Sequence, residues 1–156
     1  LDNFHKKSRR GRSAALNLVI TETGAGKAVG QILPELEGRL TANAIRVPTP
    51  NVSLAIMKLS LGKALKSSEL NDFLRQIAFH SPYKDQIDFT NSSETVSSDF
   101  VGNRYAGIID STATICNKDH AILYVWYDNE FGYTVQLLGL AKEMVGLTYK
   151  RYPDYR

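Results

Sequence analysis

Apolar residues recur along the chain in two periods, which together outline its secondary structure. Period-two alternation and short apolar runs predict β-strands, and these fall at residues 14–21, 43–47, 51–61, 96–101, 106–117 and 121–126. Apolar residues three and four positions apart predict helices, which run over residues 23–36, 67–80 and 133–146. Because strands and helices mix without regular βαβ alternation, the expected fold class is α+β, with a mixed, largely antiparallel sheet and helices packed on one face.

Three polar segments show no such period. In the basic segment 1–13, six of the eight residues from His5 to Arg12 are His, Lys or Arg. We expect a loop or extended arm there, and three roles stay open: a solvated arm, a nucleic-acid patch, or an anion site. Residues 82–95 are expected to be irregular, and residues 147–156 to form a basic, aromatic tail.

Composition narrows the class of protein. With 156 residues, 43% of them hydrophobic and 22% charged, the chain has the make-up of one globular domain or part of one. No apolar run is long enough to span a membrane, so no membrane partner is expected. The single cysteine, Cys116, cannot form an internal disulfide, which fits a cytoplasmic location. Since Cys116 lies in an apolar strand, we expect it to be a structural residue.

The net charge of +3 does not describe a uniformly basic surface. Much of the basic excess lies at the two ends of the chain, and the middle is close to balanced. No Phe, Tyr or Trp that could stack on bases is interleaved among the basic residues 5–12. Nucleic acid is therefore not the expected partner.

Three polar residues stand where the last predicted strand meets the last predicted helix. Asp128, Asn129 and Glu130 follow the apolar run 122–126. A strand that delivers polar atoms beside a helix start can present them at the edge of a cleft. A plain polar turn explains the same pattern, and the local sequence leaves both interpretations open.

Thr23 and Gly24 begin the first predicted helix and are candidates for binding an anion. Threonine is a good N-cap, glycine lets a ligand approach the backbone closely, and the start of a helix attracts anions. A simple capped helix is the alternative. The nucleotide-binding P-loop is rejected, because Thr21 replaces its first glycine and Ala28 replaces its Mg²⁺-binding Ser or Thr.

Arg46 lies between Ile45 and Val47 in an apolar strand. A charged side chain there must reach solvent, pair with a carboxylate or bind an anion. From these residues alone, an internal ion pair is the favoured interpretation.

Three motifs occur in an order that resembles a known family. They are Thr-Gly-Ala-Gly-Lys-Ala-Val-Gly at 23–30, Ile-Arg-Val-Pro-Thr-Pro-Asn-Val-Ser at 45–53, and Trp-Tyr-Asp-Asn-Glu-Phe-Gly-Tyr at 126–133. They are similar to T-G-A-A-K-A-V, R-V-P-T-x-N-V-S and W-Y-D-N-E-W-G-Y of glyceraldehyde-3-phosphate dehydrogenases. The similarity runs from about residue 5 to residue 145, with Gly26 in place of the usual Ala and Phe131 in place of the usual Trp.

The resemblance implies a phosphate-binding role for four residues. By this similarity, Thr23 and Gly24 hold a substrate phosphate through the Thr23 hydroxyl and the two main-chain amides, and Arg46 binds the C3 phosphate of the substrate. Arg10 matches an arginine that helps to hold substrate or inorganic phosphate. The segment 1–13 resembles part of a loop that lines the active site and the neighbouring subunit.

The resemblance also implies a cofactor and a reaction. Asn129 resembles the residue that bonds the nicotinamide carboxamide of NAD, and Tyr133 packs nearby. The family oxidises and phosphorylates glyceraldehyde 3-phosphate to 1,3-bisphosphoglycerate in glycolysis, by covalent catalysis with a cysteine and a histidine. The nucleophile motif C-T-T-N-C and the dinucleotide fingerprint G-x-G-x-x-G are missing from the 156 residues. Residues 1–156 are therefore expected to be the C-terminal part of the catalytic domain of a two-domain dehydrogenase, with the Rossmann domain absent, no catalytic residue and no metal site.

The implied partners follow from the same resemblance. They are glyceraldehyde 3-phosphate, inorganic phosphate, the missing N-terminal Rossmann domain and further copies in a homotetramer. NADP is not excluded as the cofactor, because that choice lies in the missing domain. A non-catalytic anion or nucleic-acid binding module that uses the basic ends is the alternative from another functional class.

Overall fold

The structure is a computed structural model that describes residues 4–147, and the chain divides into two compact units, Leu1–Pro50 (unit 1) and Asn51–Arg156 (unit 2). Unit 1 is built on a two-stranded antiparallel ribbon of β1 (Val19–Glu22) and β2 (Asn43–Arg46). The helix α1 (Ala25–Ile32) follows β1, and short 3₁₀ turns lie at η1 (Ser8–Gly11), η2 (Ala14–Leu16) and η3 (Pro34–Leu36).

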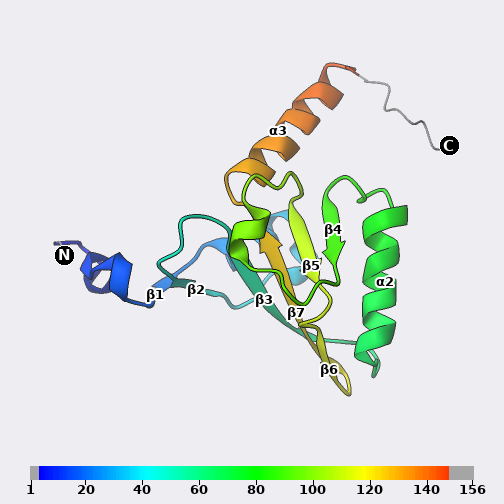
Figure 1. Ribbon diagram of the computed structural model, residues 1–156, viewed down its shortest axis with the longest axis horizontal. Helices are drawn as coiled ribbons and strands as arrows, with labels where there is room; N and C mark the ends of the chain where they lie inside the picture. Colours follow the sequence, from blue (N-terminus) through cyan, green and yellow to red (C-terminus); the bar gives the residue numbers. More distant parts are fainter. Residues whose placement is uncertain (1–3, 148–156) are drawn as a thin grey trace. The chain divides into compact units, whose positions relative to one another are not determined.

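Unit 2 contains a five-stranded mixed sheet (Figure 1). Its strands are β3 (Ser53–Ser60), β4 (Ile87–Thr90), β5 (Gly107–Asp110), β6 (Ile115–Asn117) and β7 (His120–Tyr127). The order is β3-β7-β5-β4, and β6 also pairs with β7; only β4 and β5 run parallel. Two long helices, α2 (Ser67–His80) and α3 (Phe131–Met144), complete the unit together with the 3₁₀ turn η4 (Ser97–Phe100). The predicted α+β class with a mixed, largely antiparallel sheet is confirmed.

The core of unit 2 lies where α2 covers one face of the sheet. Leu70 of α2 packs on Ala121 and Leu123 of β7, and all three are at most 6% exposed. Cys116 of β6 packs against this cluster, as expected for a structural cysteine. The start of α2 is fixed by the Lys66 main-chain N–H, which donates to the Glu69 carboxylate at 2.8 Å.

Two expected elements of unit 1 are shorter than the sequence predicted. The strand expected at 14–21 is confined to β1, because η2 precedes it. The helix expected to reach residue 36 ends at Ile32, and Pro34 begins the separate turn η3. Proline cannot donate to a helical carbonyl and disfavours a helical conformation in the residue before it.

Three expectations for unit 2 were wrong. The strand predicted at 96–101 is the turn η4, in which the Asp99 carboxylate accepts the Val96 main-chain N–H at 2.8 Å. The strand predicted at 106–117 is two strands, because Asp110 accepts the main-chain N–H of Thr112 and folds the chain into a turn. The segment 82–95, expected to be irregular, contains β4. The predicted tail lies outside the described residues from position 148 onward.

The carboxylate of Asp128 joins three segments of unit 2. Asp128 is only 2% exposed. Oδ1 accepts the main-chain N–H groups of Glu130 at 3.0 Å and Phe131 at 2.9 Å, so α3 begins at residue 131 rather than at the predicted 133. Oδ2 accepts the main-chain N–H of Gly102 at 2.9 Å and the side-chain amide of Asn51 at 3.0 Å.

These donors hold the pKa of Asp128 below its ordinary value of 3.8. The N–H of Phe131 lowers the pKa most, followed by that of Gly102, while burial acts in the opposite direction. Since the pKa is lower in the folded protein than in the unfolded chain, the ionised carboxylate stabilises the fold fully above the unfolded-state pKa. This stabilisation is lost as the pH falls through the folded-state pKa.

We expect Asp128→Asn to lower the free energy of unfolding near neutral pH by about 2–4 kcal/mol, because one amide oxygen cannot serve four donors and buried N–H groups lose their acceptor. The stability of the variant should also fall less than that of the wild type as the pH drops below about 4. Urea unfolding followed by circular dichroism measures both effects. Asp72→Asn, whose side chain is 72% exposed on α2, is the control. Equal acid sensitivity of wild type and Asp128→Asn would contradict the assignment.

Candidate functional site

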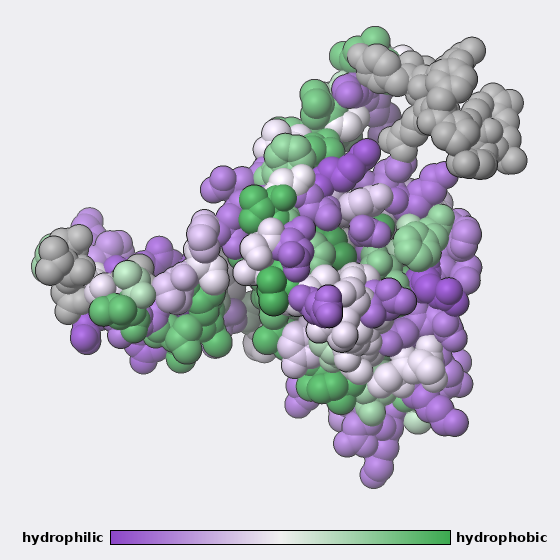
Figure 2. Space-filling model, in the orientation of Figure 1, coloured by the Kyte–Doolittle hydropathy of each residue, from purple (hydrophilic) through white to green (hydrophobic). Residues whose placement is uncertain are grey.

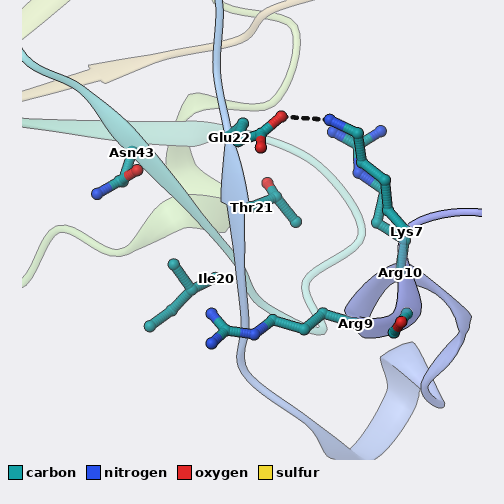
Figure 3. Close-up of a pocket in the computed structure, with 8 residues that line it drawn as sticks. Lys7, Arg9, Arg10, Ile20, Thr21, Glu22 and Asn43 are labelled. Carbon is teal, nitrogen blue, oxygen red and sulfur yellow. Dashed lines mark hydrogen bonds and ion pairs between the residues drawn. The ribbon is translucent and has the colours of Figure 1, made fainter.

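Basic side chains of unit 1 line a pocket beside β1 (Figure 3). Its volume is about 460 Å³, and its lining residues are Lys7, Ser8, Arg9, Arg10, Ile20, Thr21, Glu22 and Asn43. Lys7 forms an ion pair with Glu22. The hydrogen bond and charge of Lys7 lower the pKa of Glu22, and the charge of Arg10 adds a smaller effect. Arg10 and Glu22 line the same pocket, and Glu22 ends the strand that precedes Thr23.

Thr23 and Gly24 form the turn between β1 and α1. The Thr23 hydroxyl oxygen accepts the main-chain N–H of Ala25 at 3.2 Å. Gly24, rather than the predicted Thr23, is the N-cap residue of α1. A side-chain atom added at Gly24 would meet nothing within 4 Å. The turn is therefore open to a ligand that accepts hydrogen bonds.

Arg46 ends β2 and is exposed. Among residues 4–147, it has no ion pair or hydrogen bond from its side chain, so the internal ion pair favoured by the local sequence is not formed within this part of the chain. In the ribbon, Arg46 lies opposite Val19, whereas Thr23 follows Glu22, which lies opposite Asn43. Arg46 and the Thr23–Gly24 turn are thus at opposite ends of the ribbon, roughly 13 Å apart along the strands.

Asn129 and Tyr133 flank the start of α3 in unit 2. Both residues are exposed, Tyr133 to 69%. The first turn of α3 is held closely to the preceding loop, because a side-chain atom at Gly132 would lie 2.6 Å from the carbonyl oxygen of Tyr105. The side chain of Gln136 also donates to the carbonyl of Arg104 at 3.1 Å. Asn129 and Tyr133 are therefore exposed on a fixed helix start.

The sequence did not separate the roles of the three polar residues after β7. Asp128 is buried as a structural acceptor, whereas Asn129 and Glu130 are exposed. Sequence reasoning also missed the two residues at and just before the start of β3 that hold residues 128 and 129 in place. Asn51 donates to Asp128, and the Ser53 hydroxyl donates to the Asn129 side-chain oxygen at 3.3 Å.

Among residues 4–147, no group of three or more His, Cys, Asp or Glu side chains is arranged to hold a metal ion. Within the same range, no helix has both the length and the apolar character needed to cross a membrane.

The sequence was compared with known families and proteins. Residues 1–129 match the family described as glyceraldehyde 3-phosphate dehydrogenase, C-terminal domain. A glyceraldehyde-3-phosphate dehydrogenase-like protein of Pseudomonas aeruginosa (strain UCBPP-PA14) is 58% identical over 153 residues, which are 98% of this chain and 33% of that protein.

Two relatives from other organisms have lower identity. The glyceraldehyde-3-phosphate dehydrogenase of Glossina morsitans morsitans is 44% identical over 87% of this chain and 40% of its own length. Glyceraldehyde-3-phosphate dehydrogenase 2 of Trichormus variabilis (strain ATCC 29413 / PCC 7937) is 41% identical over 91% of this chain and 42% of its own length. The chain thus spans between a third and about two fifths of these curated relatives, and it belongs to the glyceraldehyde 3-phosphate dehydrogenase C-terminal domain family.

Proposed function

We propose that this chain is part of a phosphorylating glyceraldehyde-3-phosphate dehydrogenase, a cytoplasmic oxidoreductase of glycolysis. The whole protein would convert glyceraldehyde 3-phosphate and inorganic phosphate to 1,3-bisphosphoglycerate. The observation that carries this proposal is Arg46, which stands in a family motif and is exposed without an ion pair among the described residues.

The anion-binding part of this function belongs to unit 1. Its described residues, 4–50, hold eight Lys and Arg against three Glu, which favours anionic ligands. The planar guanidinium of Arg46 can bind two oxygens of one phosphate. The Thr23–Gly24 turn offers a hydroxyl and a main-chain N–H, with Arg10 on the same side of β1 as the pocket. The separation of Arg46 from this turn supports two distinct anion sites, one for the C3 phosphate and one for inorganic phosphate.

The cofactor-contacting part belongs to unit 2. NAD, or NADP, would accept the hydride from the substrate. The exposed amide of Asn129 can exchange hydrogen bonds with the carboxamide of a nicotinamide ring, and the exposed ring of Tyr133 can pack beside it. These side chains fit such a group, since they supply one amide and one aromatic surface.

The nucleophile and the general base are proposed to lie elsewhere in the whole protein. Cys116 packs against the core of unit 2 and is the one cysteine of the sequence, so we do not assign it the attacking thiolate. Thr23, Gly24, Arg46, Arg10, Asn129 and Tyr133 would bind and orient, while another segment performs covalent catalysis.

Two apolar surfaces of unit 2 support a larger assembly. Leu54 and Ile56 of β3 lie on the sheet face opposite α2, and Ile56 is 62% exposed. On α3, hydrophobic residues remain exposed along the helix (Figure 2): Leu137, Leu138, Leu140 and Met144. We propose that the sheet face joins further copies in a homotetramer, and that an N-terminal Rossmann domain covers α3.

We expect Arg46→Ala in the full-length protein to lower kcat/KM for glyceraldehyde 3-phosphate roughly 10- to 100-fold, because a charged hydrogen-bond donor to phosphate is lost. Arg46→Lys should recover only part of this loss, since lysine keeps the charge but not the paired donors. Steady-state kinetics measures the effect, with Arg39→Ala in the same unit as the control for net charge.

The same variant separates the enzyme from the alternative of an anion or nucleic-acid binding module, which the basic pocket of unit 1 favours. Such a module would bind nucleic acid with a salt dependence that reflects several phosphates, and it would keep this binding in Arg46→Ala. Retained binding together with unchanged aldehyde kinetics would overturn the dehydrogenase assignment.

We expect Ile56→Glu to lower the oligomeric mass of the full-length protein, because a buried carboxylate at a subunit contact is costly. Light scattering coupled to size-exclusion chromatography measures the mass. Phe73→Glu is a matched control, because Phe73 is 60% exposed on α2, which covers the other face of the sheet. An unchanged mass for Ile56→Glu would remove this face from the proposed interface.

The 156 residues by themselves should not oxidise glyceraldehyde 3-phosphate, because the sequence carries no cysteine outside the core of unit 2. Absorbance of the reduced cofactor at high protein concentration provides the measurement. NAD-dependent turnover by this chain alone would show that the proposed division of labour is wrong.

A further inference from the structure

The first residues of unit 2 hold two consecutive residues at the end of β7. β3 and β7 run antiparallel with Ser53 opposite Tyr127, so the start of β3 lies beside the end of β7. The Asn51 amide donates to the Asp128 carboxylate at 3.0 Å, and the Ser53 hydroxyl donates to Asn129 Oδ1 at 3.3 Å. One contact therefore fixes Asp128, and the other fixes the side chain of Asn129.

Val52, between these two donors, has an unusual main-chain conformation. Its φ is +72°, in the left-handed region that β-branched residues rarely enter. Such a conformation is strained and persists only where the surrounding structure holds it. The side-chain hydrogen bonds of its two neighbours, Asn51 and Ser53, hold Val52 in this conformation.

The main chain that follows Asn129 is fixed as well. The buried Asp128 carboxylate accepts the N–H groups of Glu130 and Phe131, the two residues that follow Asn129. Asn129 is thus an exposed side chain on an immobilised backbone, and its remaining freedom is rotation of the side chain. The Ser53 hydroxyl restricts that rotation by holding Oδ1, which leaves both N–H groups of Nδ2 for a ligand carbonyl.

We propose that Ser53 is a positioning residue that orients the Asn129 amide toward the nicotinamide carboxamide. This inference rests on the proposed function, in which Asn129 contacts the cofactor. Ser53 itself does not touch the cofactor; it removes the cost of ordering the amide when the cofactor binds. The Asn51–Asp128 contact and the pairing of Ser53 with Tyr127 keep the Ser53 hydroxyl in place.

The test uses the full-length protein and two ligands, NAD and ADP-ribose, which lacks the nicotinamide ring. We expect Ser53→Ala to raise the Kd for NAD about three- to tenfold, as for the loss of one neutral hydrogen bond. The Kd for ADP-ribose should stay within about twofold, whereas a merely structural defect would raise both constants. Ser53→Thr keeps the hydroxyl and should restore NAD binding. Isothermal titration calorimetry gives each Kd without turnover.

Two further variants complete the design. Ser60→Ala, an exposed serine at the other end of β3, should leave both constants unchanged. Asn129→Ala should weaken NAD but not ADP-ribose, and adding Ser53→Ala to it should change little, because coupled residues are not additive. If Asn129→Ala leaves NAD binding unchanged, the proposed cofactor role fails and the inference fails with it. If Asn129→Ala weakens NAD but Ser53→Ala does not, or adds its full effect in the double variant, only the positioning role is overturned.

Discussion

The buried carboxylate of Asp128 is the constraint on which the end of β7 and the start of α3 depend. A carboxylate that is 2% exposed must have its oxygens satisfied. Here the donors come from three places, namely the start of β3, the turn at Gly102 and the first residues of α3. The same group therefore caps a helix and ties that helix start to two other segments. Asn129 owes its defined position to this neighbour.

The elements that the sequence predicted well are the long, periodic ones. The strands β3 and β7 and the helices α2 and α3 each repeat their apolar residues often enough to identify the element. The short elements were missed because local hydrogen bonds decided them. Residues 96–101 have an apolar residue at each end, which predicted a strand. Instead, the Asp99 carboxylate accepts the Val96 main-chain N–H and the segment forms the turn η4. β4 is only four residues long and is stabilised by parallel pairing with β5, a contact that no local pattern records.

In the candidate site, too, local features could be predicted from the sequence, whereas contacts between distant residues could not. Asn129 and the turn at Thr23–Gly24 could be named as candidates from strand ends, helix starts and family motifs. The contacts that support Asn129 could not be expected, because Ser53 is 76 residues away from it in sequence, and Asn51 is 77 residues from Asp128. These two hydrogen-bonded pairs depend on the register of β3 against β7. The alternation of apolar and polar residues within either strand alone does not specify that register.

The overall charge of +3 conceals a second division within the chain. Residues 4–50 carry eight Lys and Arg against three acidic residues, whereas residues 51–147 carry eight against eleven. Under the proposed function, the C3 phosphate of the substrate and inorganic phosphate bind the basic unit, and the positively charged nicotinamide ring of oxidised NAD binds the acidic unit. A cation in the place of Asn129 would repel that ring. A neutral amide, oriented by a neutral hydroxyl, can bond the carboxamide without adding charge, so hydrogen-bond geometry would define the local contact while the acidic unit attracts the ring.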